Sequence, residues 1–121
     1  MSYRQMAKLR HSIQQKYHHY VYVVLLSPAA GRLRKVAAIN PDHDRVKPCI
    51  YVGMSGLKPE ERFLNHKRGI KASSIVKRYG LWLMPELYEY LNPMTYEEAV
   101  QMEQDLAEEL RLAGYSVTGG H

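Results

Sequence analysis

Five side chains in this sequence have types and an order that could hydrolyse a phosphodiester. An arginine grips phosphate oxygens through two parallel hydrogen bonds, an imidazole transfers protons near neutral pH, and a carboxylate is a ligand that hard divalent cations prefer. Two phenols complete the set, because a phenol can transfer or position a proton when nearby cations lower its pKa. In chain order the five residues are Tyr22, Tyr51, Arg62, His66 and Glu103.

Both tyrosines lie in runs with the composition of β-strands. The run over 20–26 is β-branched and aromatic and apolar on both faces, which predicts a central strand, and the run over 49–54 predicts a second one. Alternation puts Tyr51 and Gly53 on one face, so an antiparallel pairing lets Tyr22 and Tyr51 converge while Gly53 leaves space for a ligand. Tyrosine is common in strands, so the strands alone favour a structural role for both rings.

A predicted helix near the end of the chain carries the carboxylate. It begins after Thr95, an N-cap with Glu98 three residues later, and ends at Gly114. Glu103 points along the centre of an apolar stripe, where a charge must be paired, protonated or bound to metal. An ion pair with a buried Arg or Lys and a divalent-cation site both satisfy this condition. The stripe consists of Tyr96, Ala99, Val100, Leu106, Ala107 and Leu110.

A shorter helix is predicted to begin at Pro59 and to end at Gly69, with Arg62 and His66 on one face. Such a pair is most often exposed and without function, so it gains meaning only from its position between the second strand and the Glu103 helix. Basic side chains follow at a density that favours a nucleic-acid face over simple solvation. They are Lys67, Arg68, Lys71, Lys77 and Arg78.

The composition predicts one soluble domain over 1–121 with an anionic partner. Seventeen Lys and Arg against 12 Asp and Glu give a formal charge of +5, which favours nucleic acid first and an anionic membrane second. Cys49 is the only cysteine, and the first twenty residues contain no apolar signal region. The longest apolar run, 21–26, is too short to span a bilayer. We therefore expect a cytoplasmic protein.

Four remaining segments are less regular. Residues 1–17 are predicted as an N-terminal helix or extension, and a short helix is predicted over 73–79. Residues 27–48 are rich in Pro, Gly, Asp and Asn, which predicts an insertion loop with room for an extra strand over 36–39. The segment over 81–91 is ambiguous between strand and loop because Pro85 interrupts it.

The order and types of these residues resemble the GIY-YIG nuclease family, from about Tyr20 to the end of the chain. Tyr20-Val21-Tyr22 is similar to the GIY half of the signature and Tyr51-Val52-Gly53 to the YIG half. The resemblance implies an α/β fold whose central three-stranded antiparallel sheet is flanked by helices. It also implies one catalytic Mg²⁺ or Mn²⁺ held by Glu103, a phosphate-binding Arg62, and a His66 that some members carry.

The sequence departs from the family pattern at three places. Tyr20 stands where the family has the first glycine, and the 27–48 spacer is longer than the family's short turn. Many members read Gly-Tyr-Asn near the C-terminus, whereas this chain reads Gly-Tyr-Ser over 114–116. The asparagine is therefore missing or replaced by Ser116, Thr118 or His121.

The resulting prediction is a metal-dependent endonuclease that cleaves DNA by in-line attack of an activated water. Tyr22, Tyr51, Arg62, His66 and Glu103 are its catalytic residues, and Gly53, Lys67, Arg68, Lys71 and Lys77 are its nucleic-acid contacts. No membrane and no small-molecule cofactor are expected, and specificity comes from the insertion loop, from a homodimer or from a protein partner, unless it is absent. One alternative is a nucleic-acid-binding module of the same fold without turnover. Another is a structural domain in which Glu103 pairs with Arg62.

Overall fold

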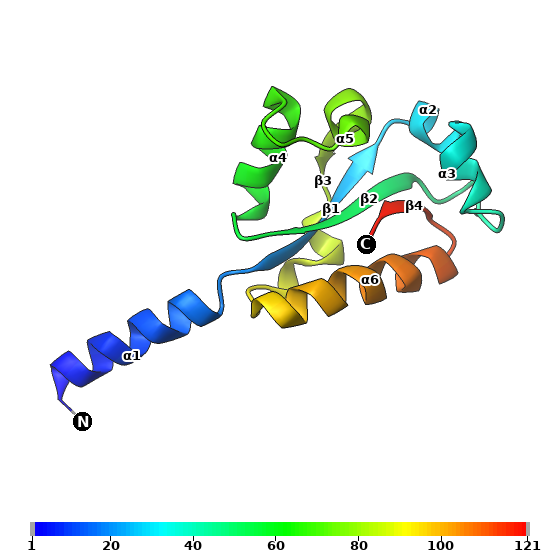
Figure 1. Ribbon diagram of the computed structural model, residues 1–121. Coiled ribbons are helices and arrows are strands. Elements are labelled where there is room, and N and C mark those ends of the chain that lie inside the picture. The colour runs from blue at the N-terminus through cyan, green and yellow to red at the C-terminus, as the bar shows by residue number, and fades with distance from the viewer. Residues whose placement is uncertain (1, 121) are drawn as a thin grey trace.

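The computed structural model, which describes residues 2–120, contains a four-stranded mixed sheet in the order β3-β1-β2-β4 (Figure 1). β1 pairs antiparallel with both β2 and β3, whereas β4 runs parallel to β2. The predicted α/β class is confirmed, but the predicted three-stranded antiparallel sheet is wrong. The sequence showed no sign of β4 because four residues are too few to display an alternating pattern. The strands are β1 Tyr20–Leu26, β2 Cys49–Ser55, β3 Gly80–Leu83 and β4 Ser116–Gly119.

The pair β1–β2 forms the centre of the sheet. Residues 21–24 of β1 are almost completely buried, because helices cover both faces of this strand. In the antiparallel register Tyr22 lies opposite Gly53 and Val24 lies opposite Tyr51. Tyr22 and Tyr51 are therefore diagonal neighbours on one face, where large side chains can touch.

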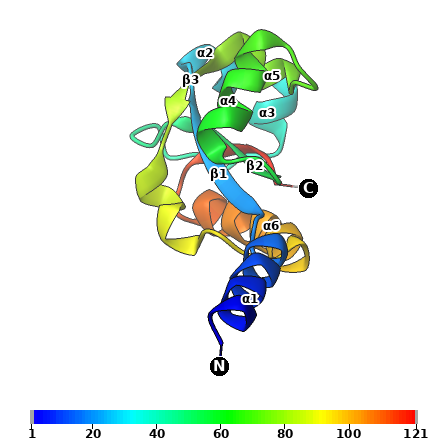
Figure 2. The same ribbon diagram turned by 90° about the vertical axis from the view of Figure 1, so that its left-hand side faces the viewer.

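Helices lie on both sides of the sheet, with α4 and α5 on one side and α6 on the other (Figure 1). α6 begins with the predicted capping box, in which Thr95 and Glu98 bond to each other's backbone N–H groups. α1 projects away from the rest of the chain, as two perpendicular views show (Figures 1 and 2). The bounds are α1 Tyr3–Lys16, α4 Pro59–Arg68, α5 Ser74–Tyr79 and α6 Tyr96–Leu112, and two single 3₁₀ turns cover Pro85–Leu87 and Glu89–Leu91.

The 27–48 segment is not a plain loop and contains no strand. It forms two short helices, α2 Pro28–Gly31 and α3 Arg34–Ala38, so the extra strand considered over 36–39 is wrong. Asn40 explains how the segment is held, because its amide donates to the carbonyl oxygens of Val36 and Val117. Its carbonyl oxygen accepts the N–H of Val117 in return. Asn40 therefore occupies the outer edge of β4 as a strand residue would.

A second asparagine does the same on the other side of the sheet. Asn92 accepts the N–H of Val21 at 2.9 Å and donates to its carbonyl oxygen at 2.8 Å. β3 pairs only with Val24 to Leu26 of β1. Asn92 therefore supplies hydrogen-bond partners to the backbone groups of Val21, which β3 does not reach. Buried backbone groups need such partners, because an unpaired one costs about as much as a lost hydrogen bond.

Candidate active site

Three of the five predicted catalytic side chains meet in a buried aromatic cluster. Tyr22 from β1 and His66 from α4 are joined by a 2.8 Å hydrogen bond between Oη and Nε2. Tyr51 from β2 completes the cluster, with its ring centroid 6.2 Å from that of Tyr22 and 5.8 Å from that of His66. Residues 15 to 44 positions apart in the sequence are therefore side by side, as the strand register and the helix position require.

The hydrogen bonds around His66 define its tautomer. The backbone N–H of Ser73 donates to Nδ1 at 3.0 Å, so Nδ1 carries no proton. The proton of the neutral imidazole is then on Nε2, which donates to the phenolic oxygen of Tyr22. Both ring nitrogens are thus engaged, and Tyr22 keeps its own proton for a different partner. Sequence reasoning had no signal for Ser73, because its contact is made through the backbone.

The protonation states of the cluster follow from its burial. Burial, with the nearby charge of Arg62, lowers the pKa of His66 to about 4, so the imidazole is neutral at physiological pH. Burial also raises the pKa of Tyr22 and of Tyr51 above the usual 10, and the attraction of Arg62 offsets only part of this effect. The sequence-based expectation that cations lower the pKa of a catalytic phenol is therefore not met in the protein alone.

Gly53 makes the approach of the two tyrosines possible. A Cβ at this position would lie 2.6 Å from Cζ and Oη of Tyr22 and 2.9 Å from Cε1 of Tyr51. At Gly119, which has a positive φ of 81°, a Cβ would meet the backbone oxygen of Val52 and the opposite edge of the Tyr51 ring, the latter at 3.0 Å. The space beside Gly53 that the sequence assigned to a ligand is thus filled by tyrosine rings, and Gly53 is buried.

Arg62 is positioned by the chain that follows its own helix. Its guanidinium donates to the carbonyl oxygens of Ile70 at 3.3 Å and Lys71 at 2.8 Å. Lys71 has a positive φ of 47°, an uncommon conformation for a residue with a side chain, and its carbonyl meets this guanidinium. Two of the five guanidinium N–H groups are used in this way, which leaves three for an anion.

Glu103 reaches the same site from α6. It is buried, as the apolar stripe predicted, with 8% of its surface exposed. Its negative charge contributes to the raised pKa of both Tyr22 and Tyr51, so the carboxylate lies within electrostatic range of the cluster. Arg62 and Glu103 therefore lie within electrostatic range of the cluster formed by Tyr22, Tyr51 and His66.

The donor set around Glu103 fits one kind of metal. Among residues 2–120 no group of three or more His, Cys, Asp or Glu side chains could hold a metal ion, which argues against a zinc site built from protein ligands. Mg²⁺ instead keeps several waters and is often held by one or two carboxylates together with substrate phosphates. A single buried carboxylate within electrostatic range of the cluster fits that pattern, and Mn²⁺ accepts the same ligands.

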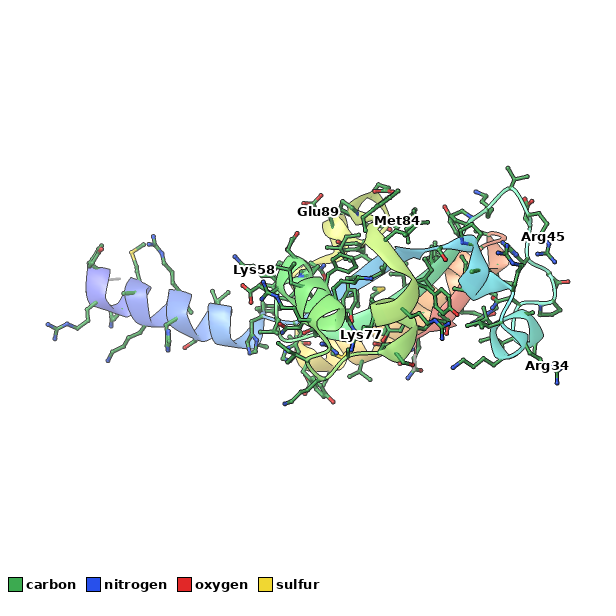
Figure 3. The ribbon with its side chains drawn as sticks, turned by 90° about the horizontal axis from the view of Figure 1, so that it is seen from above. Arg34, Arg45, Lys58, Lys77, Met84 and Glu89 are labelled. Carbon is green, nitrogen blue, oxygen red and sulfur yellow. The ribbon has the colours of Figure 1, made fainter. Side chains whose placement is uncertain are left out.

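The basic residues predicted to contact nucleic acid differ in whether their side chains already make hydrogen bonds within the protein. The ammonium of Lys67 donates to the carbonyl oxygens of Lys77 and Gly80, both at 2.9 Å, so it ties α4 to the end of α5. Arg68, Lys71 and Lys77 are exposed and make no such tie with their side chains, and Lys77 is labelled in Figure 3.

The candidates for the missing asparagine lie on β4. Ser116 is buried against Cys49, and Thr118 is the register partner of Tyr51. Of the two, Thr118 is therefore the nearer to the cluster. His121 lies outside the described residues.

The protonation of His66 should make stability depend on pH. The unfolded chain takes up this proton near pH 6.5, whereas the folded protein takes it up only near pH 4. The stability that comes from a neutral His66 is therefore fully present above pH 6.5, and it is lost as the pH falls from 6.5 to 4. We expect the free energy of unfolding to fall by up to about 3 kcal/mol over this window. Urea titrations of the wild type and of His66→Gln, in which the dependence should flatten, measure it.

Two controls separate His66 from other histidines. Burial and the charge of His18 lower the pKa of His19 as well, so the difference between wild type and His66→Gln is the relevant quantity. His11 is exposed on α1, and His11→Gln is the matched control for the effect of the substitution itself outside the cluster. An equal dependence in His66→Gln and wild type would contradict the assignment.

No helix within residues 2–120 has the length and apolar character needed to cross a membrane.

The chain was compared with protein-family models, with curated proteins and with solved structures. None of the three comparisons gave a match.

Proposed function

We propose that this chain is a metal-dependent endonuclease of the GIY-YIG type that cleaves DNA. The observation that carries the proposal is the buried bond between Tyr22 and His66 within range of the charges of Arg62 and Glu103. A purely structural core has little reason to bury a phenol, an imidazole and a carboxylate together, because each polar group loses its hydration. Perturbed ionisable groups of opposite kinds gathered in one place are typical of catalytic sites.

Each residue of the site has a role that its contacts support. The free N–H groups of Arg62 bind the phosphate oxygens and oppose the charge that develops during attack. His66 fixes the Tyr22 oxygen from behind through Nε2–H, so the phenol proton and the remaining lone pair face the site. Tyr22 can then orient the attacking water. Once its own proton has left to solvent, the phenolate can accept the proton of that water and return to the neutral phenol.

Glu103 would hold the divalent cation. When bound there, the cation neutralises charge on the phosphate and cancels the repulsion between the Glu103 carboxylate and an ionised phenol. The pKa of Tyr22 is raised by burial first, and the charges of Tyr51 and Glu103 add to this effect. Tyr51 packs against both partners.

One observation favours the binding-module alternative. In the protein alone no group of the cluster is ready to act as a base, because His66 has both nitrogens engaged and Tyr22 holds its proton. The same fold could then bind DNA through its basic helices without cleaving it. The two functions differ in a single assay.

That assay is incubation of plasmid and single-stranded DNA with the protein, in Mg²⁺ or Mn²⁺ and in EDTA. An endonuclease nicks or linearises the plasmid only with the divalent cation. A binding module retards the DNA on a gel in both buffers and leaves it intact. A domain with only a structural role gives neither result.

The exposed basic residues after His66 should set the salt dependence of DNA binding. Each lost phosphate contact lowers the log–log slope of affinity against salt by about 1, so Ala at Arg68, Lys71 and Lys77 should lower it by up to about 3. Lys67 is left unchanged because its ammonium holds α5. Fluorescence anisotropy in EDTA at several salt concentrations measures the slope.

A single exposed lysine on another helix is the control for this triple variant. Lys35 lies on α3, far along the chain from α4 and α5 and at another end of the sheet (Figure 1). Lys35→Ala should leave the slope as it is. A triple variant with the wild-type slope would place the DNA on a different face.

A further inference from the structure

A cavity of about 430 Å³ opens where β1 ends, and the proposed catalytic residues do not line it. Its walls come from the last residues of β1, from α2, from the 43–49 segment and from Leu81 of β3. Tyr22 precedes Leu26 by four residues of strand, which corresponds to about 13 Å along β1. The volume lies in the range of sites for small organic ligands.

The charges around this cavity all have one sign. Arg32, Arg45 and Lys47 line it, together with His43, and none of the lining residues is acidic. Neither Arg32 nor Arg45 has a side-chain hydrogen bond or ion pair among the residues that the structure describes. Lys47 is partly engaged, since its ammonium lies 5.1 Å from the centre of the Tyr115 ring. Two guanidinium groups are therefore available to an anion.

The nearby acid forms no ion pair with these cations within the described residues. Asp44 precedes Arg45, but its carboxylate accepts the backbone N–H of Val46 at 3.0 Å and does not line the cavity. His43 donates from Nε2 to the carbonyl oxygen of Lys47 at 2.7 Å, which closes the 43–47 turn on itself. The turn is thus held by its own hydrogen bonds, and Arg45 extends from it at the end of the molecule opposite α1 (Figure 3).

The floor and rim of the cavity are apolar. Leu26 is buried beneath it, and Pro28 and Pro48 line it. Val46 and Leu81 stand at the rim with 88% and 44% of their surfaces exposed. Apolar walls beneath free guanidinium groups match a ligand that has a flat apolar part and an anionic part. Guanidinium groups bind phosphate in a forked geometry and also stack on nucleobases.

We propose that this cavity binds a nucleotide, with the base against the apolar walls and the phosphate on Arg32 and Arg45. The nucleotide can be free in solution or can be an unpaired nucleotide within a DNA strand. The inference does not depend on cleavage, since it uses none of the residues assigned to the catalytic site.

Calorimetric titration in EDTA with the deoxynucleoside monophosphates tests the proposal while excluding turnover. Arg32→Gln with Arg45→Gln should weaken binding at least roughly tenfold, because charge-assisted bonds to phosphate are lost. Arg34→Gln with Lys35→Gln makes the same charge change on α3, outside the cavity lining, and should leave affinity unchanged. Leu81→Asp places a carboxylate in the apolar wall and should also abolish binding.

Two further ligands decide the chemical class. Pyrophosphate and laurate should bind at least tenfold more weakly than the nucleotides, because the first lacks a base and the second lacks a phosphate. Equal binding of either would overturn the nucleotide assignment. So would the absence of nucleotide binding, or binding that the Arg32 and Arg45 substitutions leave unchanged.

A DNA competition arm distinguishes the two sources. A duplex with one unpaired nucleotide should displace the free nucleotide, and a fully paired duplex of the same length should not, if the source is the DNA strand. If neither duplex competes while the free nucleotides bind, the site serves nucleotides in solution. Loss of cleavage in catalytic variants leaves all of these binding results untouched, so the two proposals fail independently.

Discussion

Glu103→Gln should lower DNA cleavage at least roughly 10³-fold while leaving DNA affinity within about twofold of wild type. The proposed site has this one carboxylate for a divalent cation, and its loss removes several kcal/mol of charge stabilisation, where each 1.36 kcal/mol is a factor of ten in rate. Affinity persists because phosphate contacts come from Arg62 and from the basic helices. Single-turnover cleavage and anisotropy in EDTA measure the two quantities separately.

A second readout of Glu103→Gln is metal binding itself. Mn²⁺ should raise the melting temperature of the wild type in the presence of uncleavable DNA, and this increase should vanish in the variant. Glu109→Gln is the matched control, because Glu109 is exposed on the same helix. Wild-type turnover in Glu103→Gln would show that the cation is held elsewhere or is not needed.

Tyr22→Phe should lower the cleavage rate by roughly 10²–10⁴, the usual contribution of a positioned acid or base. The ring keeps its packing, but Nε2–H of His66 loses its acceptor in a buried place, which costs about 1–3 kcal/mol of stability. The variant should therefore be slow and moderately less stable. Rates under single-turnover conditions and urea unfolding measure the two effects.

Tyr20→Phe is the control for Tyr22→Phe. Tyr20 lies on the same strand and face, and its phenol makes no hydrogen bond within the described residues. Its variant should cleave DNA at the wild-type rate. Full activity in Tyr22→Phe would show that another group is the base and that the two tyrosines have only a structural role.

The pKa of His66, at about 4, also predicts that His66→Gln leaves the shape of the pH–rate profile above pH 6 unchanged.

The elements predicted well were those whose signals are local. β1 and the start of α6 matched because a β-branched run and a capping box specify their own conformation. The burial of Glu103 followed from helix periodicity alone. The two helices in the 27–48 segment were missed because Asn40, which bonds to β4 far along the chain, holds that segment in place.

The sequence indicated which side chains would lie near one another but not how they would be protonated. Residue types and order brought together Tyr22, His66 and Glu103, yet the protonation of the cluster depends on burial and on the N–H of Ser73. Neither can be known before the chain is folded. Likewise Lys67 resembled a phosphate contact in the sequence, and only the end of α5 shows that its ammonium is already bonded.

The side-chain amides of Asn40 and Asn92 have a consequence for association between molecules. Open sheet edges invite strands from other chains, which leads to fibrils or to dimers with a continuous sheet. At Val117 of β4 and at Val21 of β1 the outward backbone groups are already occupied, so another strand cannot add there without expelling an asparagine. A second copy of this chain, if specificity requires one, must then pack through side chains at these positions. Both asparagines therefore oppose strand addition at these two positions.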